Sequence, residues 1–192
     1  MIDRRKLLRT GTGAGLLATG LALPIQVFGE DLEELRLARA AMLEPALRKL
    51  AFYNLHTDES TDVVYKERGQ IIPGALDEVN HILRDFRTNE IIQIDVSLLD
   101  LLDDLKNKLE VNVPFNVISG YRSPQTNAAL AARSDGVARG SLHMQGKAID
   151  IRVPGVALTH LRNVAKDMRK GGVGFYARSD FVHVDTGRVR YW

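Results

Sequence analysis

Hydrophobic and polar residues alternate along several short stretches of the chain, and this period of two is typical of strands that bury one face. We expect strands at 50–54, 61–65, 115–119, 148–153 and 181–185, with a shorter one at 175–176. Because successive side chains of a strand point to opposite faces, residues two apart are expected to lie together.

This alternation places polar groups away from the apolar residues of two strands. In 148–153, Asp150 is expected on the face opposite its two isoleucine neighbours. In 181–185, His183 and Asp185 are expected on one face and the two valines on the other. The valines and isoleucines can then enter a core while the polar groups face a cleft.

Apolar residues recur every three or four positions in three other stretches, at 73–84, 95–110 and 158–170, which predicts amphipathic helices. An alanine-rich stretch at 125–132 predicts a further helix. These elements predict a single α+β domain. We expect its helices to pack on one side of a small antiparallel sheet, with a cleft on the other side.

The first 29 residues are predicted to be a targeting segment rather than part of the fold. Arg4 and Arg5 begin a twin-arginine pattern, and a run rich in Gly, Ala, Leu and Thr follows it. Cleavage is expected near 27–29 or at Ala22, and an uncleaved membrane anchor is the alternative. Residues 30–48 are then an arm or short helix, in which Pro45 argues against one continuous helix. Residues 49–192 form the domain.

The charge and the cysteine content of the chain limit the partners and the covalent cross-links that we expect. Residues 1–29 hold four of the 26 basic residues and one of the 24 acidic residues, so the remainder carries 22 basic and 23 acidic residues. The net positive charge therefore belongs to the leader, and nothing argues for a nucleic-acid partner. The chain has no cysteine, which excludes disulfides.

The segments 141–150 and 180–185 together offer two imidazoles and three carboxylates. We interpret His143, Asp150 and His183 as three ligands of a zinc ion, with Asp180 as the base for the attacking water. Three protein ligands and one open position are the arrangement of a catalytic zinc. Asp185 can orient a ligand histidine through its other ring nitrogen. The alternative is ordinary satisfied polar structure, and spacing alone leaves both interpretations open.

Two other groups of polar residues are candidates. Arg122 lies in a glycine-bearing loop after the strand at 115–119, where its donors suit a carboxylate or a developing oxyanion. The alternative for Arg122 is a salt bridge to a local acid. Three aspartates of the helix at 95–110, at positions 100, 103 and 104, suggest calcium. We favour a solvated face, because no loop gathers them around one point.

Ordered motifs in the chain resemble the M15 zinc peptidases. They are Ser-x-His-x-x-Gly-x-Ala-x-Asp at 141–150, Asp-x-x-His at 180–183 and Ser-Gly-Tyr-Arg-Ser at 119–123. The branch associated with murein endopeptidases is more similar still, at 56–57, 83–85, 136–138, 172–174 and 181–192. The resemblance implies the fold of the D-Ala-D-Ala peptidases and Hedgehog domains.

The resemblance also implies a role for each candidate residue. His143, Asp150 and His183 would bind zinc, Asp180 would be the general base and Arg122 would contact the substrate. Many M15 members have Glu at the position of Asp180, so the shorter side chain here would place the attacking water slightly differently.

With the export signal, the resemblance implies a periplasmic enzyme that hydrolyses peptide cross-links of peptidoglycan and leaves the cytoplasm through the twin-arginine machinery. Two alternatives stay open. One is a carboxypeptidase that trims the ends of stem peptides, and the other is a zinc-bearing wall-binding module without activity.

Overall fold

The computed structural model describes residues 32, 34–36, 39, 47–133 and 138–192. The chain divides into two units, Met1–Ala38 and Arg39–Trp192, and all the described strands lie in the second. The predicted leader at 1–29 lies outside the described residues, as does most of the arm at 30–48. Within the described part, no helix is both long enough and apolar enough to cross a membrane.

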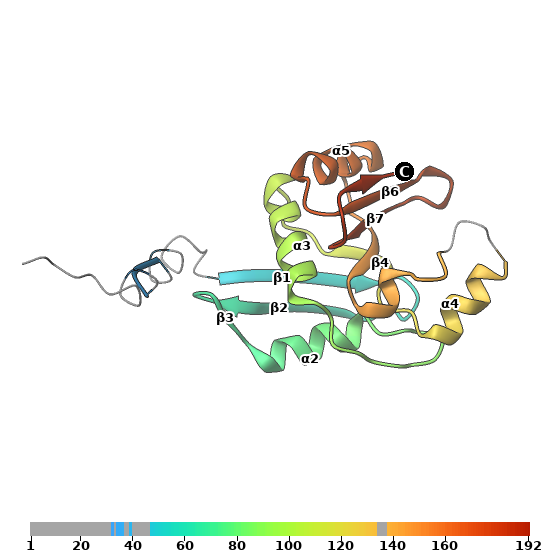
Figure 1. Cartoon of the computed structure of the whole chain (residues 1–192), viewed down its shortest axis with the longest axis horizontal. Helices are drawn as coiled ribbons and strands as arrows, with labels where there is room; N and C mark the ends of the chain where they lie inside the picture. The colour runs from blue at the N-terminus through green and yellow to red at the C-terminus, as the bar shows by residue number, and fades with distance from the viewer. Residues whose placement is uncertain (1–31, 33, 37–38, 40–46, 134–137) are drawn as a thin grey trace, which may run out of the picture. The chain divides into compact units, whose positions relative to one another are not determined.

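The second unit is built on one eight-stranded sheet with the strand order β3-β2-β1-β4-β5-β7-β6-β8 (Figure 1). The strands are β1 (Leu47–Asn54), β2 (Ser60–Glu67), β3 (Gln70–Ile71), β4 (Phe115–Ser119), β5 (Ala148–Arg152), β6 (Gly172–Tyr176), β7 (Phe181–Asp185) and β8 (Arg190–Tyr191). The α+β class is therefore confirmed. All the longer strands lie where alternation predicts them, within a few residues.

The prediction of a small antiparallel sheet is wrong, because the sheet is large and mixed. β1 pairs with β4 in parallel, and so does β6 with β8, whereas the other neighbours are antiparallel. A parallel pair needs a long crossover connection. The chain between β1 and β4 supplies one, since it contains β2, β3 and two helices.

Among the residues described from 47 onward, the α-helices are α2 (Pro73–Ile82), α3 (Val96–Lys108), α4 (Pro124–Ala131) and α5 (Leu158–Met168), and each matches a predicted stretch. In Figure 1, α2 lies beside β2, which it contacts. Side chains of α2, α3 and α5 share one core with the isoleucines of β5 and the valines of β7. The predicted division of these two strands into an apolar and a polar face is therefore confirmed, and their polar residues lie on the face away from the core.

The acidic residues of α3 are held by cations of the chain itself. The ammonium of Lys66 lies 2.8 Å from Asp100, and that of Lys106 lies 2.8 Å from Asp103. Asp103 is buried, so the expected solvated face is only partly correct. These ion pairs supply a structural explanation for the acidic cluster without calcium.

Candidate metal centre

Two adjacent strands and a short turn bring together the three predicted ligands. Asp150 on β5 pairs directly with His183 on the antiparallel neighbour β7. His143 comes from a 3-10 helix, η1 (Leu142–Gln145), which alternation did not predict. Gly146 ends η1 at a φ of +65°, a conformation that glycine adopts easily, and this turn returns the chain into β5.

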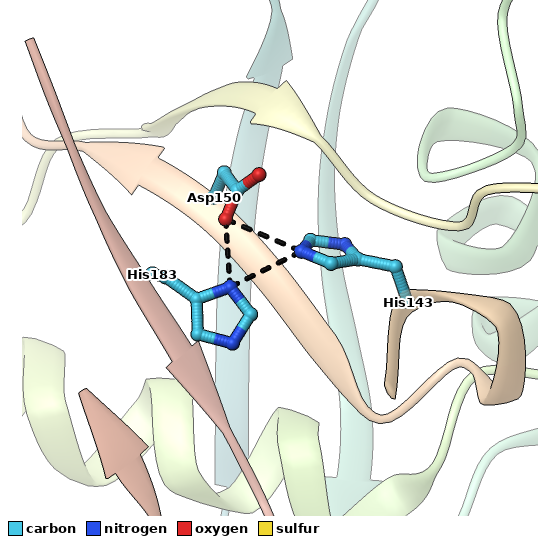
Figure 2. A group of neighbouring side chains, drawn as sticks. All are labelled: His143, Asp150 and His183. Carbon is cyan, nitrogen blue, oxygen red and sulfur yellow. Dashed lines mark hydrogen bonds and ion pairs between the residues drawn. The ribbon is translucent and has the colours of Figure 1, made fainter. Parts of the chain in front are cut away.

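Figure 2 shows the three side chains pointing toward one another. His143 Nε2 lies 3.1 Å from His183 Nδ1 and 3.2 Å from Asp150 Oδ1, and His183 Nδ1 lies 2.8 Å from the same oxygen. All three residues are buried. Atoms that bind one zinc ion at about 2.0–2.2 Å are separated from one another by about this much. The arrangement can hold a metal ion.

Hydrogen bonds on the far side of each ring fix which nitrogen faces the centre. His143 Nδ1 lies 2.7 Å from the carbonyl oxygen of Gly120, to which it donates. His183 Nε2 lies 2.9 Å from Asp185 Oδ2 and donates to that carboxylate. Each bond leaves the inward nitrogen of a neutral ring with a lone pair. Asp185 therefore makes the contact expected of a residue that orients His183.

Three lone pairs consequently converge on one buried point, and none of the three atoms has a proton to share when both rings are neutral. Such a group is satisfied by a cation or by a proton. Two imidazole nitrogens and one carboxylate oxygen are typical ligands of zinc. The donor set of this site therefore fits a divalent metal.

Burial and the neighbouring groups act in opposite directions on the pKa values of the three residues. Burial disfavours the charge on Asp150, but His143 and His183 hold the pKa of its carboxyl well below the usual range. Burial lowers the pKa of His143. Burial also acts against a proton on His183, but hydrogen bonds to Asp150 and Asp185 outweigh it and raise the pKa of that imidazole. Without a metal, a proton is therefore most stable on His183.

Arg122 lies at the centre, in the loop that follows β4. Its guanidinium pairs with Asp150 Oδ2, the oxygen that does not face the histidines, and its Nε donates to Ser119 Oγ at 2.8 Å. The alternative of a salt bridge to a local acid thus describes its contact. That acid is itself one of the three predicted ligands.

The Arg122 loop is held from behind by residues just after α2. The backbone N–H of Tyr121 donates to the carbonyl of Leu83 at 2.8 Å. The backbone N–H of Ser123 donates to the buried carboxylate of Asp85, also at 2.8 Å. The motif at 83–85 includes Asp85 but does not predict this contact.

Asp180 is not brought into contact with the other candidates. Its carboxylate pairs with Arg152, and its side chain is 59% exposed. Its chain neighbours Ser179 and Phe181, however, line the same pocket as the three predicted ligands. Asp180 thus lies beside the pocket along the chain, and its role as base stays a prediction.

The pocket at the centre has a volume of about 430 Å³. Besides the three candidates and Arg122, it is lined by Tyr176, Phe181 and Trp192, which sequence reasoning did not assign to the site. The motif at 181–192 includes Phe181 and Trp192 but gives them no role, and the pairing of β6 with β7 and with the end of the chain is what brings the three rings to the pocket. Beyond that motif, their aromatic character was the only signal in the sequence.

Comparisons with known proteins assign the chain to a family. Residues 42–192 match the sequence model of the family Peptidase_M15_2, described as peptidoglycan L,D-endopeptidase MepK. The peptidoglycan L,D-endopeptidase MepK of Escherichia coli K12 is 42% identical over 190 residues, which cover 99% of this chain and 97% of that protein. A probable peptidoglycan L,D-endopeptidase MepK of Haemophilus influenzae is 37% identical over 174 residues, or 90% of each chain. This chain therefore belongs to the Peptidase_M15_2 family of M15 peptidases.

Proposed function

We propose that this chain is a zinc metallopeptidase that hydrolyses the peptide cross-links of peptidoglycan, as a murein endopeptidase. The observation that carries the proposal is the convergence of three buried lone pairs, from His143, Asp150 and His183, at an open pocket. The name shared by the relatives supplies the substrate class and makes cross-links of the L,D type the expected bonds.

His143, Asp150 and His183 would hold the zinc ion, with the inward nitrogens fixed by Gly120 and Asp185. A bound zinc supplies a Lewis acid for the scissile carbonyl and lowers the pKa of water towards neutrality. The two other tasks, stabilisation of negative charge and proton transfer, are assigned to Arg122 and Asp180.

Arg122 is assigned to the developing negative charge on the substrate. Its guanidinium lines the pocket and is held by Ser119 and Asp150, so its position is set before the substrate arrives. Fixed N–H donors aimed at an oxygen that gains charge stabilise the transition state, because they need no reorganisation during the reaction. Donors of this planar group that are not engaged by Ser119 or Asp150 are suited to that contact.

Asp180 is assigned to proton transfer. Its carboxylate would accept the proton of the attacking water and then deliver it to the leaving amine. The position of Ser179 and Phe181 in the pocket wall supports this assignment, as does the place of Arg152 on the same strand face as Asp150. In this role the carboxylate leaves Arg152 and turns into the pocket.

The reaction is assigned to the periplasm, with residues 1–29 as a twin-arginine signal. A peptidoglycan enzyme acts in the cell envelope, and the twin arginines at Arg4 and Arg5 support this route. Replacing both arginines by lysine should keep the protein in the cytoplasm. Unchanged recovery from the periplasm would refute the assignment.

Mass spectrometry of muropeptides tests the proposed function. Purified sacculi are incubated with the zinc-loaded chain, with His143→Ala as the variant that lacks a ligand and His160→Ala, an exposed histidine of α5, as the matched control. Loss of cross-linked dimers with the chain and the control, but not with His143→Ala, is expected. Shortened monomers with intact dimers would instead indicate a carboxypeptidase. Binding to sacculi without any product would indicate a wall-binding module.

A further inference from the structure

Three aromatic side chains, Tyr176, Phe181 and Trp192, form a wall of the pocket beside His183. The rings of Tyr176 and Phe181 are stacked, with centroids 4.6 Å apart and planes 20° apart. The indole of Trp192 has its centroid 5.3 Å from that of His183 and donates through Nε1 to the Tyr176 hydroxyl at 2.8 Å. We call these three residues the aromatic wall.

The chain is built to hold Trp192 against β6. Its backbone N–H donates to Val173 and its carbonyl accepts from Phe175, at 3.3 and 2.9 Å. Gly174 lies between these two residues, and a Cβ there would be only 2.6–2.8 Å from the indole. The absence of a side chain at this strand position is therefore what allows the indole to lie so close to the backbone.

Despite this fixed position, Trp192 remains 50% exposed. The guanidinium carbon of Arg190 lies 4.9 Å from the indole centroid, so this cation is close to the ring as well. A large rigid aromatic surface that faces a pocket gains free energy when a ligand covers it, because apolar area is removed from water. The hydroxyl of Tyr176 and the guanidinium of Arg190, which both lie beside the indole, can orient that ligand.

The position of the aromatic wall indicates which part of the substrate would cover it. Trp192 is the member of the wall whose ring lies next to His183. The proposed function places the scissile amide at the metal that His183 would bind, so this end of the wall is the nearest to that amide. The part of the substrate that lies closest to the scissile amide is the adjacent residue of the peptide. The sugars of peptidoglycan are joined to the stem peptide, several bonds away from a cross-link. Peptide is therefore favoured over sugar as the occupant.

We infer that the aromatic wall is a specificity-determining subsite that binds the aliphatic part of the peptide residue next to the scissile bond. Trp192 is its principal contact, and Gly174 positions Trp192. This inference rests on the proposed function for the identity of the substrate. It assigns the wall to substrate binding rather than to metal binding or proton transfer.

The kinetics of four variants test the inference on soluble cross-linked muropeptide dimers. Trp192→Ala should raise KM about tenfold or more with kcat changed far less, and Trp192→Phe should restore most of the affinity. Gly174→Ala should resemble Trp192→Ala, because the added Cβ displaces the indole while the residue itself remains. Tyr191→Ala is the matched control, since this aromatic neighbour is 42% exposed and lies outside the pocket lining. Its KM should equal that of the unmodified chain.

Each result has a defined consequence. A KM for Trp192→Ala within twofold of the unmodified chain would overturn the inference. The same assay on dimers whose sugars have been removed separates the two occupants. An unchanged effect of Trp192→Ala on these dimers supports a peptide subsite, and loss of the effect would show a sugar subsite instead.

A binding measurement separates this inference from the proposed function. Trp192 is the only tryptophan of the chain, so its fluorescence reports on the wall alone. Adding the sugar-free dimer to the metal-free chain should shift the emission in a saturable way. A shift without any hydrolysis by the zinc-loaded chain would support the subsite and refute the proposed function. Hydrolysis without a shift in the emission would support the proposed function and refute the subsite.

Discussion

The carboxylate of Asp185 accepts a hydrogen bond from Nε2 of His183 at 2.9 Å, two residues away on the same face of β7. Arg190 holds this carboxylate at 2.7 and 3.0 Å, and the backbone N–H of Gly187 donates to it at 2.8 Å. Asp185 is buried and so cannot easily turn away. The ring of His183 is thereby fixed with Nδ1 toward the predicted metal.

Removing this carboxylate should weaken metal binding without abolishing it. In Asp185→Ala the ring of His183 is free to rotate and its basicity falls, so the affinity for zinc should drop about 10–100-fold. Competition with a chromogenic chelator measures this directly. An affinity equal to that of the unmodified chain would mean that Asp185 does not support the metal.

Arg122 should matter for turnover more than for the metal. Arg122→Ala removes donors that stabilise the developing oxyanion, and we expect kcat to fall about 10²–10³-fold. Zinc should remain at one per chain, because the three ligand atoms are unchanged. Arg133→Ala, at an exposed arginine beyond α4, is the matched control and should leave both quantities unaltered. Loss of zinc together with activity in Arg122→Ala would make the contact with Asp150 structural.

Asp180 and Arg152 form an ion pair, so variants of each separate a base from a surface contact. As a general base, Asp180 should contribute about 10²–10⁴-fold to kcat, and Asp180→Asn should lose this with zinc retained. Arg152→Ala should keep most of the activity, since it leaves the carboxylate in place. Equal, small effects of both substitutions on kcat would reduce the pair to a surface salt bridge.

The pH dependence of stability should report on Asp85. Burial works against the charge of this carboxylate, but hydrogen bonds from Thr126 and two backbone N–H groups lower its pKa to about 2 from an ordinary 3.8. The pKa is lower in the folded state, so the stabilisation is complete above pH 4 and is lost as the pH falls towards 2. The shift corresponds to about 2 kcal/mol.

Asp85→Asn should therefore lower the free energy of unfolding by about 2 kcal/mol at pH 7. The difference from the unmodified chain should shrink between pH 4 and pH 2. Urea unfolding at several pH values measures it. A difference that stays constant with pH would show that the charge of Asp85 makes no contribution.

Much of the fold could be predicted because the longer elements carry their pattern in their own residues. The alternation in β5 and β7 was enough to place Asp150 and His183 on the face away from the core, which the structure confirms. The strands β3 and β8 were not predicted, since two residues carry no period. The parallel pairing of β1 with β4 depends on the path of the intervening chain rather than on local pattern.

In the site, too, the features that depend on local sequence pattern were predicted, and those that depend on distant pairing were not. His143, Asp150 and His183 were found because they are ligand types on short apolar segments, and the structure brings them together. The aromatic wall was missed because its members meet only when β6, β7 and the residues after β8 align. The contact between Asp85 and the Arg122 loop joins residues 38 positions apart, beyond the reach of any local pattern.

We expect one divalent metal ion to bind between His143, Asp150 and His183, and the proposed function depends on this ion. An anomalous difference map, recorded at the zinc edge from crystals of the domain grown with zinc, tests it most directly. We predict one strong peak within about 2.0–2.2 Å of His143 Nε2, Asp150 Oδ1 and His183 Nδ1, with its remaining side open to the pocket. A peak elsewhere, or a fourth protein ligand that closes the site, would refute the proposed catalytic metal site.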